Sequence, residues 1–286
     1  MEWALRQAEM VERERVLPTG RGVVQVAMDD AVEPGQSMVQ GAMPSWPVLA
    51  GLRGRVVRII PERGVVVAGT ATVIAGLAGF GPATVGPVIF LPSPSAFSPA
   101  LPQGAIGIAT GELTRDLLNM AIAGRLAGIF AASARPETIE MLAGTDCTAL
   151  LDGSLPATNT LPLSIVLAHG FGVRTLKAEI VQVLAGAVGQ PILLNPGMAG
   201  EAGRPPELLL PLPWQTPIRT ERTARLVPGV AVWVKGGEHD GLSGRMVRVL
   251  SAGQVFPSGV RARAARIRLE SGIEVTLPLA NLQRVG

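Results

Sequence analysis

The sequence predicts a multidomain α+β protein with two β-rich parts on either side of a small α/β domain. Near the start, short β-branched runs alternate with glycine and proline, which is typical of strands and turns. The middle alternates short apolar runs with helical patterns, and the end returns to valines at period two. The predicted parts are a β-rich domain over 1–99, an α/β domain with a parallel sheet over 100–203, a proline-rich linker over 204–225 and a small β domain over 226–286.

The composition indicates a folded chain with aliphatic cores. Apolar residues make up 48% of the 286 residues and charged residues only 16%, which excludes global disorder. The single cysteine, Cys147, excludes an internal disulfide and a cysteine zinc cluster, so we expect a reducing, cytoplasmic location. Tyrosine is absent, and Trp233 and Phe256 are the only aromatic residues of the last domain, so base-stacking side chains are few.

Basic residues are concentrated at the end of the chain. Residues 1–212 hold 14 basic and 17 acidic residues, and residues 213–286 hold 11 basic and 5 acidic ones. The net charges are therefore −3 and +6, which together give the +3 of the whole chain. A cationic module on a mildly acidic body is typical of a protein with a phosphate-rich partner.

The region from Gly64 to Gly111 holds no charged residue. Its first part is long enough to span a bilayer, but Gly64 to Leu91 includes six glycines and two prolines and lacks flanking aromatic residues. We therefore expect buried strands joined by glycine turns, with membrane contact as the less favoured alternative. The first residues alternate acidic and basic side chains, so no signal peptide is expected.

The N-terminal part is predicted to begin with a short helix over residues 1–15. Two strands around an acidic turn should follow from Gly22 to Ala42, and two more from Gly54 to Val67. The run D-D-A-V-E-P-G-Q at 29–36 resembles the strand pair of a barrel-sandwich hybrid, the fold of biotinyl and lipoyl carriers.

That resemblance implies the carrier fold without the carrier function. Carriers attach their prosthetic group to a lysine at the reversal between the strand pairs, whereas the reversal here is A-M-P-S-W-P. The chain has only Lys177 and Lys235. We therefore expect no attached cofactor.

In the middle domain, four strands should alternate with three helices. The apolar spacing from Leu113 to Ile122 predicts a helix ending at Gly124, Pro136 should lie in the first turn of a second, and Val173 to Leu184 predicts a third. The predicted strands are the apolar runs at 105–109, 127–132, 163–168 and 191–194. This order favours a parallel sheet with helices on its faces.

Ligands of such sheets lie beyond the carboxyl ends of the strands, where loops lead into helices. If the three loops meet at one edge, a crevice would be lined by Glu112, Ser133, Arg135, His169 and Arg174. The alternative is structural: Thr114 and Ser133 would be helix N-caps and His169 a structural residue without an adjacent carboxylate.

Consecutive residues on a turn rarely converge on one ion, so Glu238, His239 and Asp240 are not expected to bind a metal.

The run from Arg204 to Arg219 is rich in proline. Proline lacks the backbone N–H that a helix interior or a central strand needs, so we expect neither there. This run is predicted as the start of the linker to the last domain.

Residues 227–247 read V-P-G-V-A-V-W-V-K-G-G-E-H-D-G-L-S-G-R-M-V. The valines alternate along two predicted strands, and glycines 229, 237, 241 and 244 fit a tight turn between them. This pattern, in about a fifth of the chain, resembles the KOW motif of SH3-like β-barrels in ribosomal proteins and transcription elongation factors. The resemblance implies binding to RNA, ribonucleoprotein or a protein partner. The order of parts along the whole chain also resembles uncharacterised bacterial KOW-containing proteins, which implies no known reaction.

Arginines cluster in the same domain. The run R-A-R-A-A-R-I-R at 261–268 would place its first two arginines on one face of a strand and its last two on the other, unless a bulge at Ala264 and Ala265 shifts the phase. The predicted phosphate contacts are Arg245, Arg248, Arg261, Arg263, Arg266 and Arg268. Nothing resembles a base-reading helix, so binding should not depend on sequence.

Three functions therefore stand side by side. The favoured hypothesis is a non-enzymatic cytoplasmic adaptor that binds nucleic acid or ribonucleoprotein through its basic barrel, while the body binds a protein partner or ligand. The second is an enzyme or small-molecule sensor that uses the α/β crevice. The third is a structural subunit whose uncharged segment packs against another chain.

Overall fold

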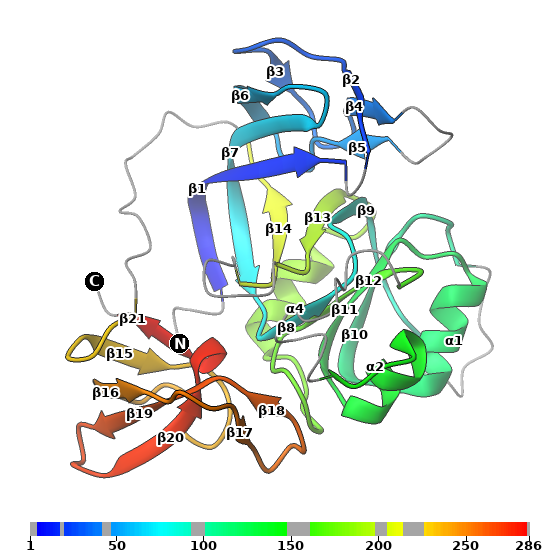
Figure 1. The fold of residues 1–286 in the computed structure, drawn as a ribbon. Coiled ribbons are helices and arrows are strands. Elements are labelled where there is room, and N and C mark those ends of the chain that lie inside the picture. Colours follow the sequence, from blue (N-terminus) through cyan, green and yellow to red (C-terminus); the bar gives the residue numbers. More distant parts are fainter. Residues whose placement is uncertain are drawn as a thin grey trace.

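A computed structural model describes residues 5–17, 20–41, 47–92, 101–147, 161–197, 205–213 and 226–284. These residues form a β-rich α+β fold with one large mixed sheet, three small antiparallel sheets and three α-helices (Figure 1). Within them, no helix is long and apolar enough to cross a membrane. Residues 42–46 of the predicted reversal and residues 214–225 of the predicted linker lie outside the described residues.

The large sheet has eleven strands. Strands β9 to β12 are parallel to one another, and the remaining pairs are antiparallel. The order is β3 (Ala31–Val32), β6 (Gly54–Ile60), β7 (Gly64–Ala75), β14 (Glu207–Pro211), β13 (Pro191–Asn195), β9 (Thr84–Phe90), β10 (Ile106–Leu113), β11 (Gly128–Ala134), β12 (Ser164–Leu167) and β8 (Ala78–Phe80), with β1 (Leu5–Val16) beside β7.

Strand β7 is the centre of the N-terminal part. It pairs with β1 along one edge, and with β6 and then β14 along the other. All twelve of its residues are buried. A strand that is covered on both faces and paired on both edges tolerates no charge. The start of the uncharged segment is therefore buried core, as predicted.

The helix predicted over residues 1–15 is wrong, because Leu5–Val16 forms strand β1. In its second half, Val11 and Arg15 are buried and the intervening Glu12 and Glu14 are exposed, which is the alternation of a half-buried strand. The mixed charges fit a helix equally well. The free edge of β7 decides the outcome, because it pairs with this segment along almost its whole length.

The two strands predicted around the acidic turn are present. They are β2 (Gly22–Val24) and β4 (Ser37–Gly41), which form a three-stranded sheet with β5 (Val48–Leu49). The short β3 lies between them in sequence but pairs with β6 of the large sheet. One apolar core joins the two sheets, with Met38 and Val39 against Val56 and Val65.

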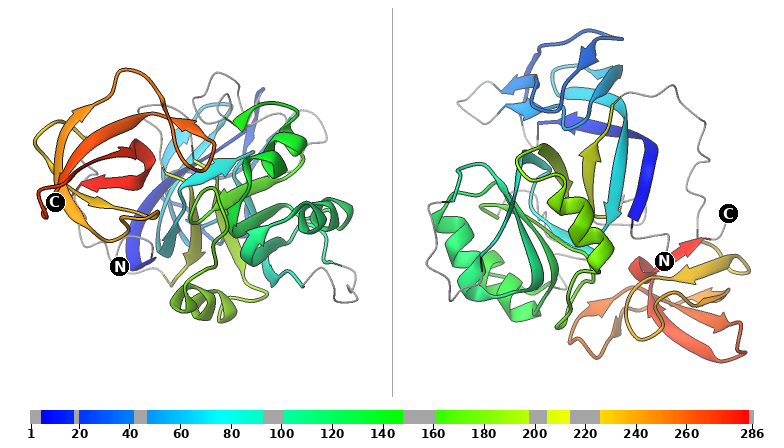
Figure 2. Two further views of the ribbon diagram at one scale, coloured as in Figure 1. Left: turned by 90° about the horizontal axis from the view of Figure 1, so that it is seen from below. Right: turned by 180° about the vertical axis from the view of Figure 1, so that it is seen from behind.

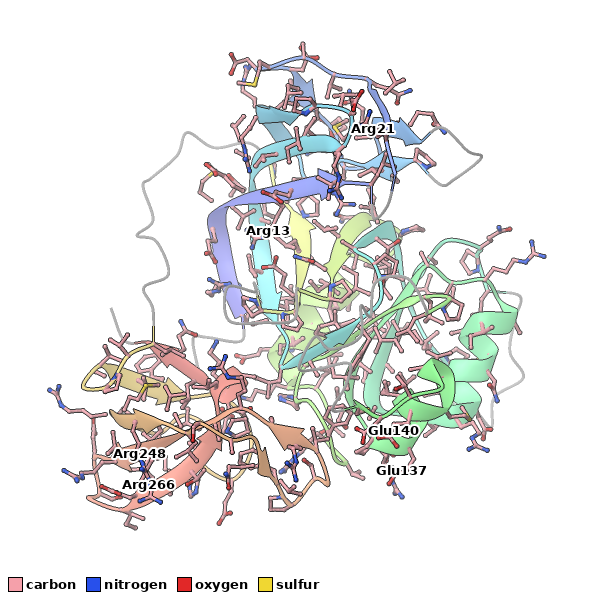
Figure 3. All side chains as sticks on the ribbon, in the orientation of Figure 1. Arg13, Arg21, Glu137, Glu140, Arg248 and Arg266 are labelled. Carbon is pink, nitrogen blue, oxygen red and sulfur yellow. The ribbon has the colours of Figure 1, made fainter. Side chains whose placement is uncertain are left out.

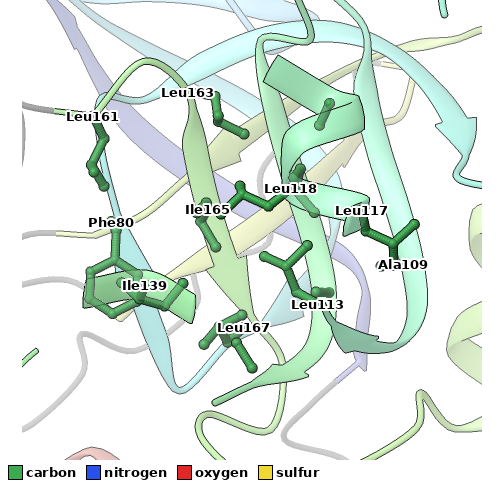
Figure 4. Close-up of a cluster of buried hydrophobic side chains, with 14 of the residues drawn as sticks. Phe80, Ala109, Leu113, Leu117, Leu118, Ile139, Leu161, Leu163, Ile165 and Leu167 are labelled. Atoms are coloured by element: carbon green, nitrogen blue, oxygen red, sulfur yellow. The ribbon is translucent and has the colours of Figure 1, made fainter. Parts of the chain in front are cut away.

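Helices cover both faces of the parallel strands. Helices α1 (Arg115–Ala123) and α2 (Pro136–Ala143) pack on one face, in the core shown in Figure 4. Helix α4 (Ala178–Ala185) packs on the other. The caps of α1 at Thr114 and Gly124 and the proline at the start of α2 are as predicted. The third helix begins later than predicted, because 173–177 form a loop.

The proline-rich run holds an interior strand, so the prediction that it would form none is wrong. Strand β14 pairs with β7 on one side and β13 on the other. Its prolines lie before Glu207 and at its last residue, Pro211, so the residues between them keep their N–H groups. Strand β13 was predicted as the fourth strand of the parallel sheet, and this is wrong, because it is antiparallel to both of its neighbours. The fourth parallel strand is β9.

The last residues form a separate antiparallel sheet beside the body (Figure 2). The predicted strand–turn–strand is present, with positive φ at Gly229, Gly237 and Gly241. The order is β20 (Glu274–Pro278), β19 (Ala264–Leu269), β16 (Ser243–Val249), β15 (Ala231–Val234) and β21 (Leu282–Arg284), with a 3-10 turn at Leu279–Asn281. Strands β17 (Gln254–Val255) and β18 (Arg261–Ala262) form a two-stranded sheet of their own.

Candidate functional site

The C-terminal sheet has one apolar face and one polar face. Alternate residues of its strands, among them Val232, Val234, Met246, Ile267 and Leu269, form a buried cluster. Because side chains alternate along a strand, the residues between them point to the opposite face. That opposite face carries most of the predicted phosphate contacts.

Four arginines lie on this polar face as two cross-strand pairs. Arg245 of β16 is opposite Arg268 of β19, and Arg248 is opposite Arg266. A register shift between Met246 and Arg248 inserts Val247 as an extra residue. This bulge returns Arg248 to the face of Arg245, although the two are an odd number of residues apart. Figure 3 shows Arg248 and Arg266 close together on this sheet. We call these four residues the arginine face.

Little negative charge balances the arginine face. Glu274 of β20 contacts Arg268 at 2.7 Å and Arg266 at 3.9 Å. The Arg245 guanidinium donates a hydrogen bond of 3.3 Å to the carbonyl of Gly229. Within the described residues, Arg248 has no ion-pair partner, and Glu274 is the one carboxylate in ion-pair contact with the four. Four positive charges are thus held together against one negative charge.

Three exposed arginines of the N-terminal part each form an ion pair with a carboxylate of their own. Arg21 pairs with Glu62, Arg53 with Glu33, and Arg58 with Glu14, at 3.2, 2.9 and 2.7 Å respectively. Each of these charges has its own carboxylate. Arg55 of the same part is also exposed and, among the described residues, donates a hydrogen bond to the Asp29 carbonyl without an ion pair. The arginine face differs in placing four arginines together on one sheet surface.

The other two predicted contacts lie apart from the arginine face. Arg261 belongs to β18, and Arg263 lies between β18 and β19. The prediction that 261–268 form one strand is wrong, because the strand is interrupted at Arg263. The Arg263 carbonyl accepts a hydrogen bond from the Leu279 N–H at 2.9 Å. Ala264 and Ala265 are both buried, which marks the irregular position that the sequence suggested. Arg266 and Arg268 share a face, as predicted.

Two residues of the polar face were not predicted from the sequence. Glu274 was not expected to oppose Arg268, and Trp233 was not expected beside the arginines. The period-two alternation around Trp233 was visible in the sequence. The sequence did not show that the strand paired with it would carry the arginines.

The comparisons with known proteins add no relative. No family model, no curated protein and no solved structure matches the chain.

The carboxyl edge of the parallel strands brings the predicted crevice residues together in pairs. The Arg135 guanidinium lies 2.9 Å from the Glu112 carboxylate. The buried Ser133 hydroxyl accepts a hydrogen bond from the Arg174 N–H at 2.9 Å. Ser133 is therefore no helix N-cap: it lies within β11, and the residue before α2 is Arg135. These polar groups hold the loops to one another.

His169 follows β12 and lies where the body meets the C-terminal sheet. The Lys177 ammonium contacts the Asp240 carboxylate at 3.3 Å across this junction. Burial lowers the pKa of His169, and the charges of Lys177 and Arg174 lower it further, although Asp240 and the Thr175 backbone oppose them. The imidazole is therefore neutral at physiological pH.

Asp240 belongs to the turn between β15 and β16. Burial acts to raise its pKa, but the hydrogen bond from the Gly236 N–H and the charge of Lys177 outweigh burial and hold the pKa below its ordinary value. Gly236 itself lies against Leu77 of the body: an added Cβ would be 2.8 Å from the Leu77 side chain. The turn is thus a docking element between the two parts of the chain.

Within the described residues, no group of three His, Cys, Asp or Glu side chains could hold a metal ion.

Proposed function

We propose that this protein is a non-enzymatic cytoplasmic adaptor that binds nucleic acid or ribonucleoprotein through the arginine face. The observation that carries the proposal is the pairing of Arg245 with Arg268 and of Arg248 with Arg266 against the single carboxylate of Glu274. Like charges opposite one another destabilise a sheet. An anionic partner removes that cost and releases its own counterions on binding.

The C-terminal domain in this proposal is an SH3-like barrel of the KOW type. The support is a five-stranded antiparallel sheet around one apolar cluster and the glycine turn between β15 and β16. Gly244 fits the same motif, because an added Cβ would lie 2.5 Å from the Arg268 carbonyl oxygen. Arg261 and Arg263 are exposed and are proposed as secondary phosphate contacts.

The N-terminal part is proposed to be a barrel-sandwich hybrid that carries no prosthetic group. The sheet of β2, β4 and β5 shares one core with β3, β6 and β7, which supports this architecture. In the adaptor proposal, the body supplies the docking surface for a protein partner or a ligand.

The alternatives have less support. An enzyme or sensor at the α/β edge would need free polar groups there, but Arg135 and Glu112 contact each other and Ser133 bonds to the Arg174 backbone. A structural subunit that used the uncharged segment as its interface would need that segment on the surface. Strand β7 of that segment is buried within the chain.

Salt-dependent binding tests the proposal. The affinity of the full-length chain for fluorescently labelled RNA and DNA should be measured by anisotropy between about 50 and 200 mM salt. Each of Arg245→Gln, Arg248→Gln, Arg266→Gln and Arg268→Gln should weaken binding to all sequences and flatten the slope of log affinity against log salt by roughly 0.7 to 0.9.

Arg58→Gln is the matched control, because the Arg58 side chain is 60% exposed, close to the 63% of Arg268, but is paired with Glu14 on the body. It should leave both affinity and slope unchanged. If the wild-type protein binds neither RNA nor DNA at low salt, the proposal is wrong.

A further inference from the structure

Trp233 lies on the same face of the C-terminal sheet as the four arginines. Its neighbours Val232 and Val234 are both fully buried in the core, so the alternation of β15 directs the indole to the opposite side. Trp233 is partly exposed there and is opposite Ser243 of β16. It is thus an aromatic ring on the face that carries the four arginines.

The register brings the indole next to the arginine face. Ala231, two residues before Trp233, is opposite Arg245, so Trp233 and Arg245 are diagonal neighbours across β15 and β16. Diagonal residues are about 7–8 Å apart, which is within reach of aromatic and long side chains. From β15 to β20, one row across the sheet is Ala231, Arg245, Arg268 and Glu274. The next row holds Arg248, Arg266 and Thr276.

We propose that this face binds a single strand of nucleic acid, with one unpaired base stacked on Trp233 and the adjoining phosphates held by the arginine face. This inference rests on the proposed function and adds the strandedness of the partner and a stacking residue. Arginines track a nucleic-acid backbone without reading its sequence, and an aromatic ring accepts any base because every base has a π-face.

A duplex fits the face less well. Bases in a duplex are stacked on one another, so a ring on a sheet surface has no base to contact unless the duplex opens. The four arginines are two residues apart along β19 and one strand apart across the sheet, an area of about 7 Å by 5 Å. That area matches a few successive phosphates of one strand. Thr276, which is opposite Arg266 on the same face, can donate a hydrogen bond to a further phosphate or base oxygen.

The test compares a labelled single strand of about 15 nucleotides, as RNA and as DNA, with a duplex of the same sequence. The full-length protein should bind the single strand more tightly. Trp233→Ala should weaken single-strand binding by roughly 5- to 150-fold, the effect of losing one stacked base, without changing the salt slope. Arg248→Gln should flatten the slope, and Trp233→Phe should keep most of the affinity.

If Trp233→Ala does not fold, the fluorescence of Trp233 itself tests the stacking. In a variant whose other three tryptophans, Trp3, Trp46 and Trp214, are replaced by phenylalanine, the remaining fluorescence comes from Trp233. Unlabelled poly(U) should quench it on binding. The single-strand RNA and DNA arms show whether the 2′-hydroxyl contributes.

The outcomes separate this inference from the proposed function. Equal affinity for duplex and single strand, with no effect of Trp233→Ala and no quenching, would overturn stacking while salt-dependent nucleic-acid binding remained. Binding to polyglutamate with none to either nucleic acid would overturn both, and would identify the face as a surface for an acidic protein.

Discussion

Arg245 of β16 lies directly opposite Arg268 of β19, so two like charges face each other across adjacent strands. A like-charged pair of this kind destabilises a sheet, where an opposite pair would contribute roughly 0.2–1 kcal/mol. The neighbouring Arg248 and Arg266 repeat the arrangement. The isolated sheet therefore carries repulsion that Glu274 relieves on one side only.

Glu274→Gln should change stability and binding in opposite directions. Removing the carboxylate leaves Arg266 and Arg268 without an ion pair, so the free energy of unfolding should fall by up to about 1 kcal/mol at low salt, and by less at high salt. Affinity for RNA should rise, because a negative charge leaves the arginine face. Urea denaturation and anisotropy measure the two effects. Glu14→Gln is the control, since Glu14 makes an exposed ion pair with Arg58 on the body and lies outside the arginine face.

The ion pair between Arg13 and Glu207 should be a major stabilising contact of the body. The Arg13 side chain is 13% exposed and that of Glu207 3%, and Glu207 also accepts a hydrogen bond of 2.9 Å from Asn195. Arg13→Ala leaves a buried carboxylate without its cation, which should lower the free energy of unfolding by about 3–5 kcal/mol. Arg58→Ala, at an exposed pair, should cost less than about 1 kcal/mol.

A second substitution checks the cause of that loss. Adding Glu207→Gln to Arg13→Ala removes the buried charge and should recover part of the stability. If the double variant is as unstable as the sum of the two single variants, lost packing and not the unpaired charge is responsible.

His169 should make stability depend on pH. Because burial and the nearby Lys177 hold its pKa below the ordinary value in the folded state, the unfolded chain binds the proton more readily. This contribution is fully present above about pH 6.5 and is lost as the pH falls below that value toward the folded-state pKa. The melting temperature should therefore decline on acidification, and His169→Asn should flatten the decline. An unchanged profile in the variant would show that other groups dominate.

Cys147 should be inert in the folded protein. Burial raises the pKa of its thiol to about 12, with further contributions from Glu140, Asp146 and Glu137, and the side chain is 1% exposed. The thiolate is the reactive form, so a thiol reagent at mildly alkaline pH should modify the native chain very slowly. In concentrated guanidinium chloride, the same reagent should react with one thiol per chain. Rapid labelling of the native protein would mean that the region around α2 opens readily.

The local features of the fold could be predicted from the sequence. Alternating valines and glycines indicated the hairpin of β15 and β16, Thr114 and Gly124 marked the ends of α1, and the absence of charge indicated that β7 is buried. Each of these signals lies within a few residues of the element it describes. Backbone sterics, caps and hydrophobic periodicity act over that range.

Only the tertiary structure decided which segments become neighbours. Leu5–Val16 is a strand because β7 offers it an edge, and β14 is an interior strand because β13 and β7 pair with it from both sides. The arginine face arises in the same way: the sequence by itself determined that this domain is basic and that Arg266 and Arg268 share a face. The register between β16 and β19, with its bulge at Val247, placed Arg245 and Arg248 opposite them. Register depends on the turns and bulges that the whole fold imposes, and a slip of one residue would turn every side chain of a strand to the other face.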